Sequence, residues 1–453
     1  MDILLKKNDD ITLEITAMTS EGAGVGRYEG FAVFVPFALP GEKIEAHIIK
    51  VTPSYAIGKL TSIIVRSADR VDPPCPVFGK CGGCSLQHMS YASQLEYKRT
   101  LVRDALERIG GFRGVEVAPT IGMNEPSRYR NKGSFPFTET DGKPCWGLYA
   151  ARSHRVIETN DCMIEDSAAT SAANAVKQWA EENGVSVYDE TTCSGVLRHV
   201  ITRTVTEGNA VCVVTTGELP NKESLIAHIR AAVPRVRSIV HNVNSRDTNV
   251  ICGDENHLIW GSETVSQTIC GLTYNVSQES FLQVNPIQTE KLYDTAINGL
   301  ELTEEMTAAD VFCGIGTITL LLAKQAKRAV GIEYVPKAIE DAKNNALLNG
   351  IENAEFYCGA AEKLLPRLVR DGMRFDRVVL DPPRKGADPL VLEAIANCGA
   401  DRIAYISCNP ATLARDLKQL CARGFHIISV QPVDMFPFTH HVESVVLMSR
   451  AGS

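Results

Sequence analysis

Tyr405-Ile406-Ser407-Cys408-Asn409-Pro410 joins an apolar run to a turn that contains proline. The run from Arg402 predicts a buried strand that ends here, because proline cannot continue the hydrogen bonds of a sheet and disfavours helix at the preceding residue. A helix is predicted over residues 411–423. Ligands of α/β folds bind where such strands end, so Cys408 is a candidate nucleophile. The alternative is a small buried apolar side chain, which is what most free cysteines are.

Strands and helices alternate from about residue 276 onward, which predicts a doubly wound sheet. Seven strands are expected, at residues 307–312, 329–333, 355–358, 377–380, 403–407, 426–432 and 442–448. Helices separate the first six strands, whereas only residues 433–441 separate the last two. The seventh strand is therefore expected to run antiparallel, which is typical of class I methyltransferases rather than of dinucleotide dehydrogenases.

A glycine-containing loop, Asp310-Val311-Phe312-Cys313-Gly314-Ile315-Gly316-Thr317, follows the first of these strands and lets the backbone approach a ligand closely. Glu333 ends the second strand, 19 positions after Gly314. An acid at this spacing can accept hydrogen bonds from the ribose of NAD or of S-adenosylmethionine. Thr319 at the place of a third glycine, together with the antiparallel strand, favours S-adenosylmethionine. The fourth strand ends in Leu380-Asp381-Pro382-Pro383-Arg384-Lys385-Gly386, where two prolines form a rigid turn that directs Asp381 toward the ligand.

Cys408 indicates the chemistry, because carbon 5 of a pyrimidine is not nucleophilic until a group adds at carbon 6. A thiolate can make that addition, after which carbon 5 attacks a methyl donor. A base must then remove the proton on carbon 5. Glu443 begins the seventh strand, and antiparallel pairing brings it to the edge where Cys408 lies. His440 and His441 precede it; either could orient the base, although shaping the loop is the simpler role.

A cysteine cluster, Cys75, Cys81 and Cys84, has the spacing C-x5-C-x2-C. Three cysteines this close indicate a metal site, which needs a fourth ligand. Cys162 is the best candidate because it lies in a polar turn, and the spacing fits either zinc or an iron–sulfur cluster. Residues 91–110 predict an amphipathic helix ended by Gly110-Gly111. Its polar face is interpreted as solvent-facing and carries Lys98, Arg99, Arg103 and Arg108.

Short strands and glycine-rich turns over residues 1–66 predict a small barrel like an OB fold. Residues 128–155 hold six basic and two acidic residues with interleaved aromatic rings, which suits unstacked RNA, although an ordinary polar sheet face is the alternative. The candidate RNA contacts are Arg130, Lys132, Phe135 and Arg198. Residues 165–275 predict further strands and helices of an α+β domain.

The whole chain has 453 residues, 14 cysteines and a net charge of −8. The length allows about three domains, and the acidic balance argues against non-specific coating of nucleic acid. Neither a signal peptide nor an apolar run of ~18 residues is evident, so we expect a cytoplasmic protein with no membrane contact. Nothing in the sequence indicates an obligate protein partner, and a monomer is expected.

The chain resembles the RNA 5-methyluridine (uracil-C5) methyltransferases of the RumA/TrmA type over essentially its whole length. The resemblance is carried by Ser280-Phe281-Leu282-Gln283-Val284-Asn285-Pro286, the loop at 312–317, and the motifs around Asp381, Cys408 and Glu443. The glycine turn at 21–28 with residues 34–42 also resembles the TRAM domain of RNA-modifying enzymes. Thr317 stands where some relatives carry asparagine.

The resemblance implies a role for each candidate residue. Cys408 would be the nucleophile and Glu443 the proton acceptor. S-adenosylmethionine would bind at Gln283, Phe312, Gly314, Glu333 and Asp381. A [4Fe–4S] cluster would be held by Cys75, Cys81, Cys84 and Cys162. The barrel together with the cluster favours 23S ribosomal RNA over transfer RNA as the substrate.

The expected organisation is a TRAM-like RNA-binding barrel (1–66), a central α+β domain with the cluster (67–275) and a methyltransferase catalytic domain (276–453). The helix at 91–110 could pack on the catalytic domain. Two other functions compete with uracil-C5 methylation. A purine nitrogen methyltransferase leaves Cys408 and Glu443 without a role, and a non-enzymatic RNA-binding scaffold leaves the cofactor loop without one.

Overall fold

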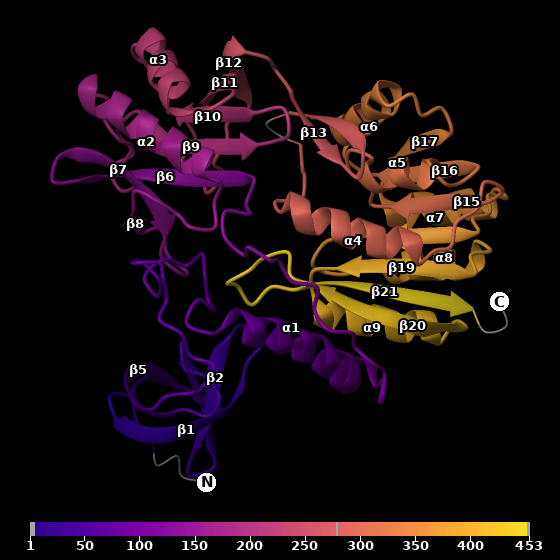
Figure 1. Ribbon diagram of the computed structural model, residues 1–453, viewed down its shortest axis with the longest axis horizontal. Coiled ribbons are helices and arrows are strands. Elements are labelled where there is room, and N and C mark those ends of the chain that lie inside the picture. Colours follow the sequence, from indigo (N-terminus) through magenta and orange to yellow (C-terminus); the bar gives the residue numbers. More distant parts are fainter. Residues whose placement is uncertain (1–4, 278–279, 451–453) are drawn as a thin grey trace.

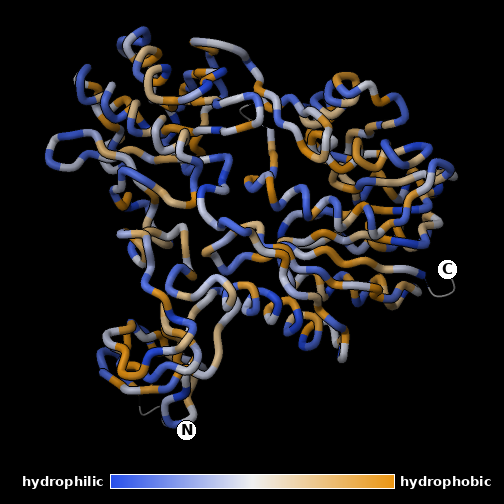
Figure 2. The backbone as a smooth tube through the Cα atoms, viewed as in Figure 1, coloured by the Kyte–Doolittle hydropathy of each residue, from blue (hydrophilic) through white to orange (hydrophobic). Residues whose placement is uncertain are grey.

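The computed structural model of the protein describes residues 5–277 and 280–450. Figure 1 shows a small barrel near the N-terminus, a sheet with two helices above it, and a larger α/β body that holds the C-terminus. Hydrophobic segments follow the strands in each of these parts, as Figure 2 shows. Among the described residues, every helix is too short or too polar to cross a lipid bilayer.

The N-terminal barrel is closed, with the strand order β1-β2-β3-β5-β4. Alternate residues of β1 point inward, and Ile11, Leu13 and Ile15 are buried there. The sequence prediction of an OB-like barrel is therefore confirmed. The five strands are β1 (Asp10–Met18), β2 (Ala23–Tyr28), β3 (Phe31–Pro36), β4 (Lys43–Val51) and β5 (Tyr55–Val65).

The central sheet has seven strands in the order β12-β11-β10-β9-β6-β7-β8. Helices α2 (Ser167–Glu182) and α3 (Lys222–Ala232) share a core with its strands, in which Trp179 and Phe135 are fully buried. The strands are β6 (Lys132–Thr140), β7 (Lys143–Tyr149), β8 (Val156–Glu158), β9 (Leu197–Thr204), β10 (Asn209–Thr215), β11 (Val236–Val243) and β12 (Glu255–Gly261).

The C-terminal sheet also has seven strands, in the order β17-β16-β15-β18-β19-β21-β20. Its first five strands along the chain pair in parallel, whereas β21 is antiparallel to both β19 and β20. The expected antiparallel seventh strand is thus confirmed. The strands are β15 (Thr307–Val311), β16 (Arg328–Glu333), β17 (Ala354–Cys358), β18 (Arg377–Leu380), β19 (Arg402–Ser407), β20 (Phe425–Val433) and β21 (Glu443–Arg450).

Helices cover both faces of this sheet, because alternate residues of each strand belong to different cores. One core includes side chains of α4 (Pro286–Asn298), α5 (Thr317–Ala323) and α6 (Pro336–Leu348). The other includes side chains of α7 (Ala361–Arg370), α8 (Pro389–Asn397), α9 (Pro410–Cys421) and α1 (Tyr91–Ala105). A hairpin of β13 (Val265–Ile269) and β14 (Leu272–Val276) packs in the first of these cores, together with α4, α5 and α6. Its Tyr274 hydroxyl donates to the Thr317 carbonyl.

Helix α1 lies far from the catalytic strands in sequence but packs directly on them. Its Val102 belongs to the same buried cluster as Val446 of β21. The helix continues as a π-helical turn, Leu106–Gly110, and ends where Gly111 adopts φ 78°. This left-handed conformation favours glycine at the end of a helix.

Candidate active site

Cys408 and Glu443 meet at the carboxyl edge of the C-terminal sheet. Ser407 ends β19 and pairs with Ser444 of β21, so the residue after the one strand lies beside the residue that begins the other. Cys408 is partly exposed, whereas Glu443 is only 4% exposed. The Oε2 atom of Glu443 has no hydrogen-bond partner within the described part of the chain. The Cys408 thiol and the buried Glu443 carboxyl group, whose Oε2 atom is unpaired among the described residues, therefore lie at the same edge of the sheet.

The electrostatics of this place disfavour further negative charge. Burial, together with the nearby Glu443 and Asp381, raises the pKa of Cys408 to about 11. Burial likewise raises the pKa of Glu443 well above its ordinary value, with a contribution from Asp381. The pKa of Asp381 is raised to about 7 by burial and by Asp310. Arg384 acts in the opposite direction on Cys408 and Glu443, so a cationic ligand placed here would stabilise the thiolate and both carboxylates.

The loop after β15 has the backbone conformation that a closely approaching ligand requires. Phe312 adopts φ 78°, Gly314 φ 54° and Gly316 φ 85°. A left-handed phenylalanine is strained, and such strain is concentrated at functional sites. The Gly314 N–H donates to Glu333 Oε2 at 3.2 Å. The Oε1 atom of Glu333 accepts from the N–H groups of Tyr334 and Val335 at 2.8 and 3.0 Å. The Glu333 carboxylate is thereby held beside the loop, where a ribose acceptor was predicted.

The segment around Gln283 lies between β14 and α4 in the chain and hydrogen-bonds to Asn131, which precedes β6 of the central sheet. The Gln283 carbonyl accepts a hydrogen bond from the Asn131 side chain at 3.3 Å, and Val284 accepts from the Asn131 N–H at 2.8 Å. The Asn285 side chain caps α4 by accepting from the Gln288 N–H. Gln283 is therefore held between the central sheet and α4 of the C-terminal body. It lies outside the loop that contains Phe312.

Residues 434–442, which connect β20 to β21, are held by side chains from distant parts of the chain. Asp434 is fully buried, forms an ion pair with the fully buried Lys98, and accepts from the Tyr91 hydroxyl at 2.8 Å. Lys98 also donates to the Phe436 carbonyl at 3.0 Å. Lys98 was predicted to face solvent, and this was wrong. Its charge is compatible with burial because Asp434 neutralises it.

The same segment is fixed at its other end by the loop that follows Cys84. The Phe438 carbonyl accepts from the N–H groups of Ser85 and Leu86 at 3.0 and 2.9 Å, and the Ser85 hydroxyl accepts from the His440 N–H at 3.0 Å. The rings of His440 and His441 lie 4.2 Å apart. Burial lowers the pKa of His441 to about 4, so its ring is neutral near pH 7. These contacts agree with a role of the two histidines in shaping the loop before Glu443.

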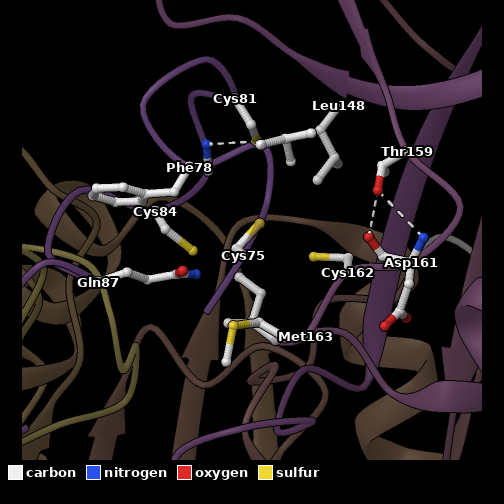
Figure 3. A pocket seen from close by; sticks show the side chains of 13 residues that line it. Cys75, Phe78, Cys81, Cys84, Gln87, Leu148, Thr159, Asp161, Cys162 and Met163 are labelled. Carbon is white, nitrogen blue, oxygen red and sulfur yellow. Dashed lines mark hydrogen bonds between the residues drawn. The ribbon is translucent and has the colours of Figure 1, made fainter. Parts of the chain in front are cut away.

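The four predicted cysteine ligands line one pocket, shown in Figure 3. The sulfur atoms of Cys75, Cys84 and Cys162 point toward a common space, and the Cys81 sulfur accepts from the Gly83 N–H at 3.3 Å. Burial raises the pKa of Cys84 to about 12 and that of Cys162 to about 11. Bound cationic metal would favour these thiolates, so the side chains fit such a group.

The spacing of these side chains does not match a single ion. Among the residues that the structure describes, no three Cys, His, Asp or Glu side chains lie close enough to share one metal ion. An iron–sulfur cube holds each thiolate on a different iron and therefore separates the ligands more widely than one zinc ion does. The four cysteines thus share one pocket without the close grouping that a single ion requires.

Two of the four predicted RNA contacts are buried in the protein core. Phe135 is fully buried and packs edge-to-face on Trp146 at 4.9 Å, so its ring cannot stack on a base. Arg198 is 6% exposed; it donates to the carbonyls of Asn244 and Arg246 and lies over the Tyr188 ring. Both side chains are buried, so they fit neither an RNA contact nor the polar sheet face that was the alternative. Arg130 forms an ion pair with Glu165 at 2.9 Å, and Lys132 is half-buried.

The sheet order, with its antiparallel β21, and the glycine-containing loop after β15 define a class I S-adenosylmethionine-dependent methyltransferase fold. Residues 245–451 match the family described as tRNA (Uracil-5-)-methyltransferase, and residues 6–61 match the TRAM domain. An RNA methyltransferase of Halalkalibacterium halodurans is 49% identical, with 98% of each chain covered. One from Clostridium tetani is 45% identical over 100% of this chain and 98% of its own. The protein belongs to the RNA uracil-5-methyltransferase family.

A solved structure agrees in fold over nearly the whole chain. The Pyrococcus abyssi tRNA (uracil-54, C5)-methyltransferase in complex with S-adenosyl-L-homocysteine has a TM-score of 0.79 and 28% identity. The similarity covers 97% of this chain and all of that one. The arrangement of barrel, central sheet and catalytic body is therefore shared with an enzyme of the family.

Proposed function

We propose that the protein methylates carbon 5 of a uridine in 23S ribosomal RNA, with Cys408 as nucleophile and Glu443 as base. The observation that carries this proposal is the pairing of Ser407 with Ser444, which brings a thiol and an otherwise unpaired carboxyl group together. A methyltransferase that acts on a purine nitrogen needs neither group. The uracil must leave its base stack, because a stacked ring hides carbon 6 from the thiol.

The reaction balances with these residues. The Cys408 thiolate adds to carbon 6, and the electron pair moves to carbon 5, which takes the methyl group. S-adenosylmethionine would supply that methyl group from its sulfonium sulfur and would leave as S-adenosylhomocysteine, which has lost the sulfonium charge. Glu443 accepts the proton on carbon 5, the bond between carbon 6 and sulfur breaks, and 5-methyluridine leaves. Asp381, Glu333, Gly314, Phe312 and Gln283 are the residues we assign to the cofactor.

The choice of ribosomal RNA rests on the TRAM barrel together with the cysteine cluster. The alternative is transfer RNA, which is the substrate of the Pyrococcus abyssi enzyme. We infer that the barrel (1–66) and the surface of the central domain (67–275), with the partly exposed Lys132 and Arg130, bind RNA beside the catalytic domain (276–453).

The substrate is tested with S-adenosylmethionine that carries a labelled methyl group. The protein is offered unmodified 23S ribosomal RNA and unmodified transfer RNA separately, and the digested nucleosides are identified. We expect labelled 5-methyluridine from ribosomal RNA. The same nucleoside from transfer RNA alone would keep the chemistry and reject the substrate, whereas label on a purine would reject both.

We further propose that Cys75, Cys81, Cys84 and Cys162 hold a [4Fe–4S] cluster with a structural or RNA-docking role, since methyl transfer requires no electron. Protein purified without oxygen is expected to be brown, with broad visible absorbance and about four iron atoms per chain. A Cys84→Ser variant should lose this absorbance, whereas Cys421→Ser should keep it. Colourless protein with one zinc ion per chain would contradict the proposal.

A further inference from the structure

Arg203 carries a buried positive charge that has no acidic partner among the described residues. The side chain lies on β9 and is 1% exposed. Its Nη2 atom donates to the Ser280 carbonyl at 2.7 Å, but Nε and Nη1 have no hydrogen-bond partner among the described residues. Burial lowers the pKa of the Arg203 guanidinium to about 10. Within residues 5–277 and 280–450, no acidic neighbour raises this pKa. The guanidinium still carries its charge at neutral pH.

The neighbours of Arg203 strengthen this positive character. Lys132 of β6 is its direct cross-strand partner, and the half-buried ammonium of Lys132 has its pKa lowered by burial and by Arg203. Ser134 shares this face of β6, and its buried hydroxyl also has no partner in the described part of the chain. Two cations and a free hydroxyl group are thus gathered around one place, all of them able to donate.

This arrangement costs stability without a ligand. A buried charge that lacks a partner costs several kcal/mol, and like charges placed opposite each other across two strands add to that cost. The position of Arg203 offers a reason for this cost. Its partner Ser280 belongs to the segment that carries Gln283, and hydrogen bonds hold this segment against the central sheet. An oxyanion bound here would satisfy the free donors of Arg203 and Ser134.

We propose that Arg203, with Lys132 and Ser134, forms an oxyanion-binding site that takes either a backbone phosphate of the RNA or the carboxylate of the cofactor. This inference rests on the proposed function only for the identity of those two ligands. The site itself is a property of the fold and should bind inorganic phosphate in the absence of both.

The test uses Arg203→Met, which keeps the length of the side chain and removes its charge. Arg237→Met is the matched control, because Arg237 is an exposed arginine of β11 in the same sheet. Inorganic phosphate is expected to raise the melting temperature of the wild type and of the control more than that of Arg203→Met. Without phosphate, Arg203→Met should be at least as stable as the wild type, because it removes an unpaired charge.

Binding measurements distinguish the two sources of the oxyanion. If the site takes a phosphate, Arg203→Met lowers the affinity for a 23S ribosomal RNA fragment about tenfold and reduces the salt slope by about one, with unchanged binding of S-adenosylhomocysteine. If it takes the carboxylate, the affinity for S-adenosylhomocysteine falls instead. Arg203→Lys keeps the charge and should retain part of the affinity. Equal stabilisation by phosphate with both affinities unchanged would overturn the site and leave Arg203 as a support of Ser280 only.

Discussion

Replacing Cys408 with alanine is expected to lower RNA methylation by about 10⁴-fold or more, because without the sulfur no group adds to carbon 6. Cofactor binding should be retained, since the loop of Phe312 and the Glu333 carboxylate do not contact Cys408 through any hydrogen bond of the described residues. The measurements are transfer of a labelled methyl group to RNA and the equilibrium affinity for S-adenosylhomocysteine.

Cys421→Ala is the matched control for this variant. Cys421 ends the helix that begins just after Cys408, and it is likewise partly buried. Its replacement should leave methylation essentially unchanged. Full activity of Cys408→Ala would mean that no covalent addition occurs, and a nitrogen target would then be the better interpretation.

The catalytic sheet could be predicted from the sequence because its signals are local. A buried run that stops at Cys408-Asn409-Pro410 specifies a strand end, and the short connection at 433–441 allows no crossover helix, so β21 must return antiparallel. These two features place β21 antiparallel beside β20, and the pairing of β21 with β19 then brings Cys408 and Glu443 together. The prediction therefore needed no knowledge of how distant segments pack.

The errors arose where long-range packing decides the outcome. Lys98 has the periodicity of a solvent-facing residue, but its partner Asp434 lies 336 positions away and appears in no local pattern. Phe135 is one of several rings between basic residues, and a count of charges does not tell which face of β6 meets the helices. Arg203 gave no signal at all, because an arginine in a strand pattern does not reveal whether an acid lies beside it.

The segment 434–442 explains how the buried base is held in place. Lys98, Tyr91 and Ser85 fix this segment from the N-terminal half of the chain, and Glu443 follows immediately after it. A carboxyl group whose pKa is raised by burial is a stronger base once ionised.

Glu443→Gln is therefore expected to stop the reaction after methyl transfer. Glutamine keeps the shape of the side chain but cannot accept the proton on carbon 5, so turnover should fall by about 10²–10⁴-fold. Addition of Cys408 and methyl transfer need no carboxylate, and the methylated RNA should remain bonded to the protein. The measurement is a protein–RNA adduct that survives denaturation and carries the labelled methyl group.

The double variant Cys408→Ala/Glu443→Gln is the control, because it lacks the sulfur that forms the adduct. The adduct should be absent there and should map to Cys408 in the single variant. If Glu443→Gln turned over slowly without any adduct, Glu443 would act before methyl transfer, for example on the Cys408 thiol. If it turned over at the wild-type rate, another group would have to remove the proton. Accumulation of the methylated adduct alone would show that Glu443 completes the reaction that Cys408 begins.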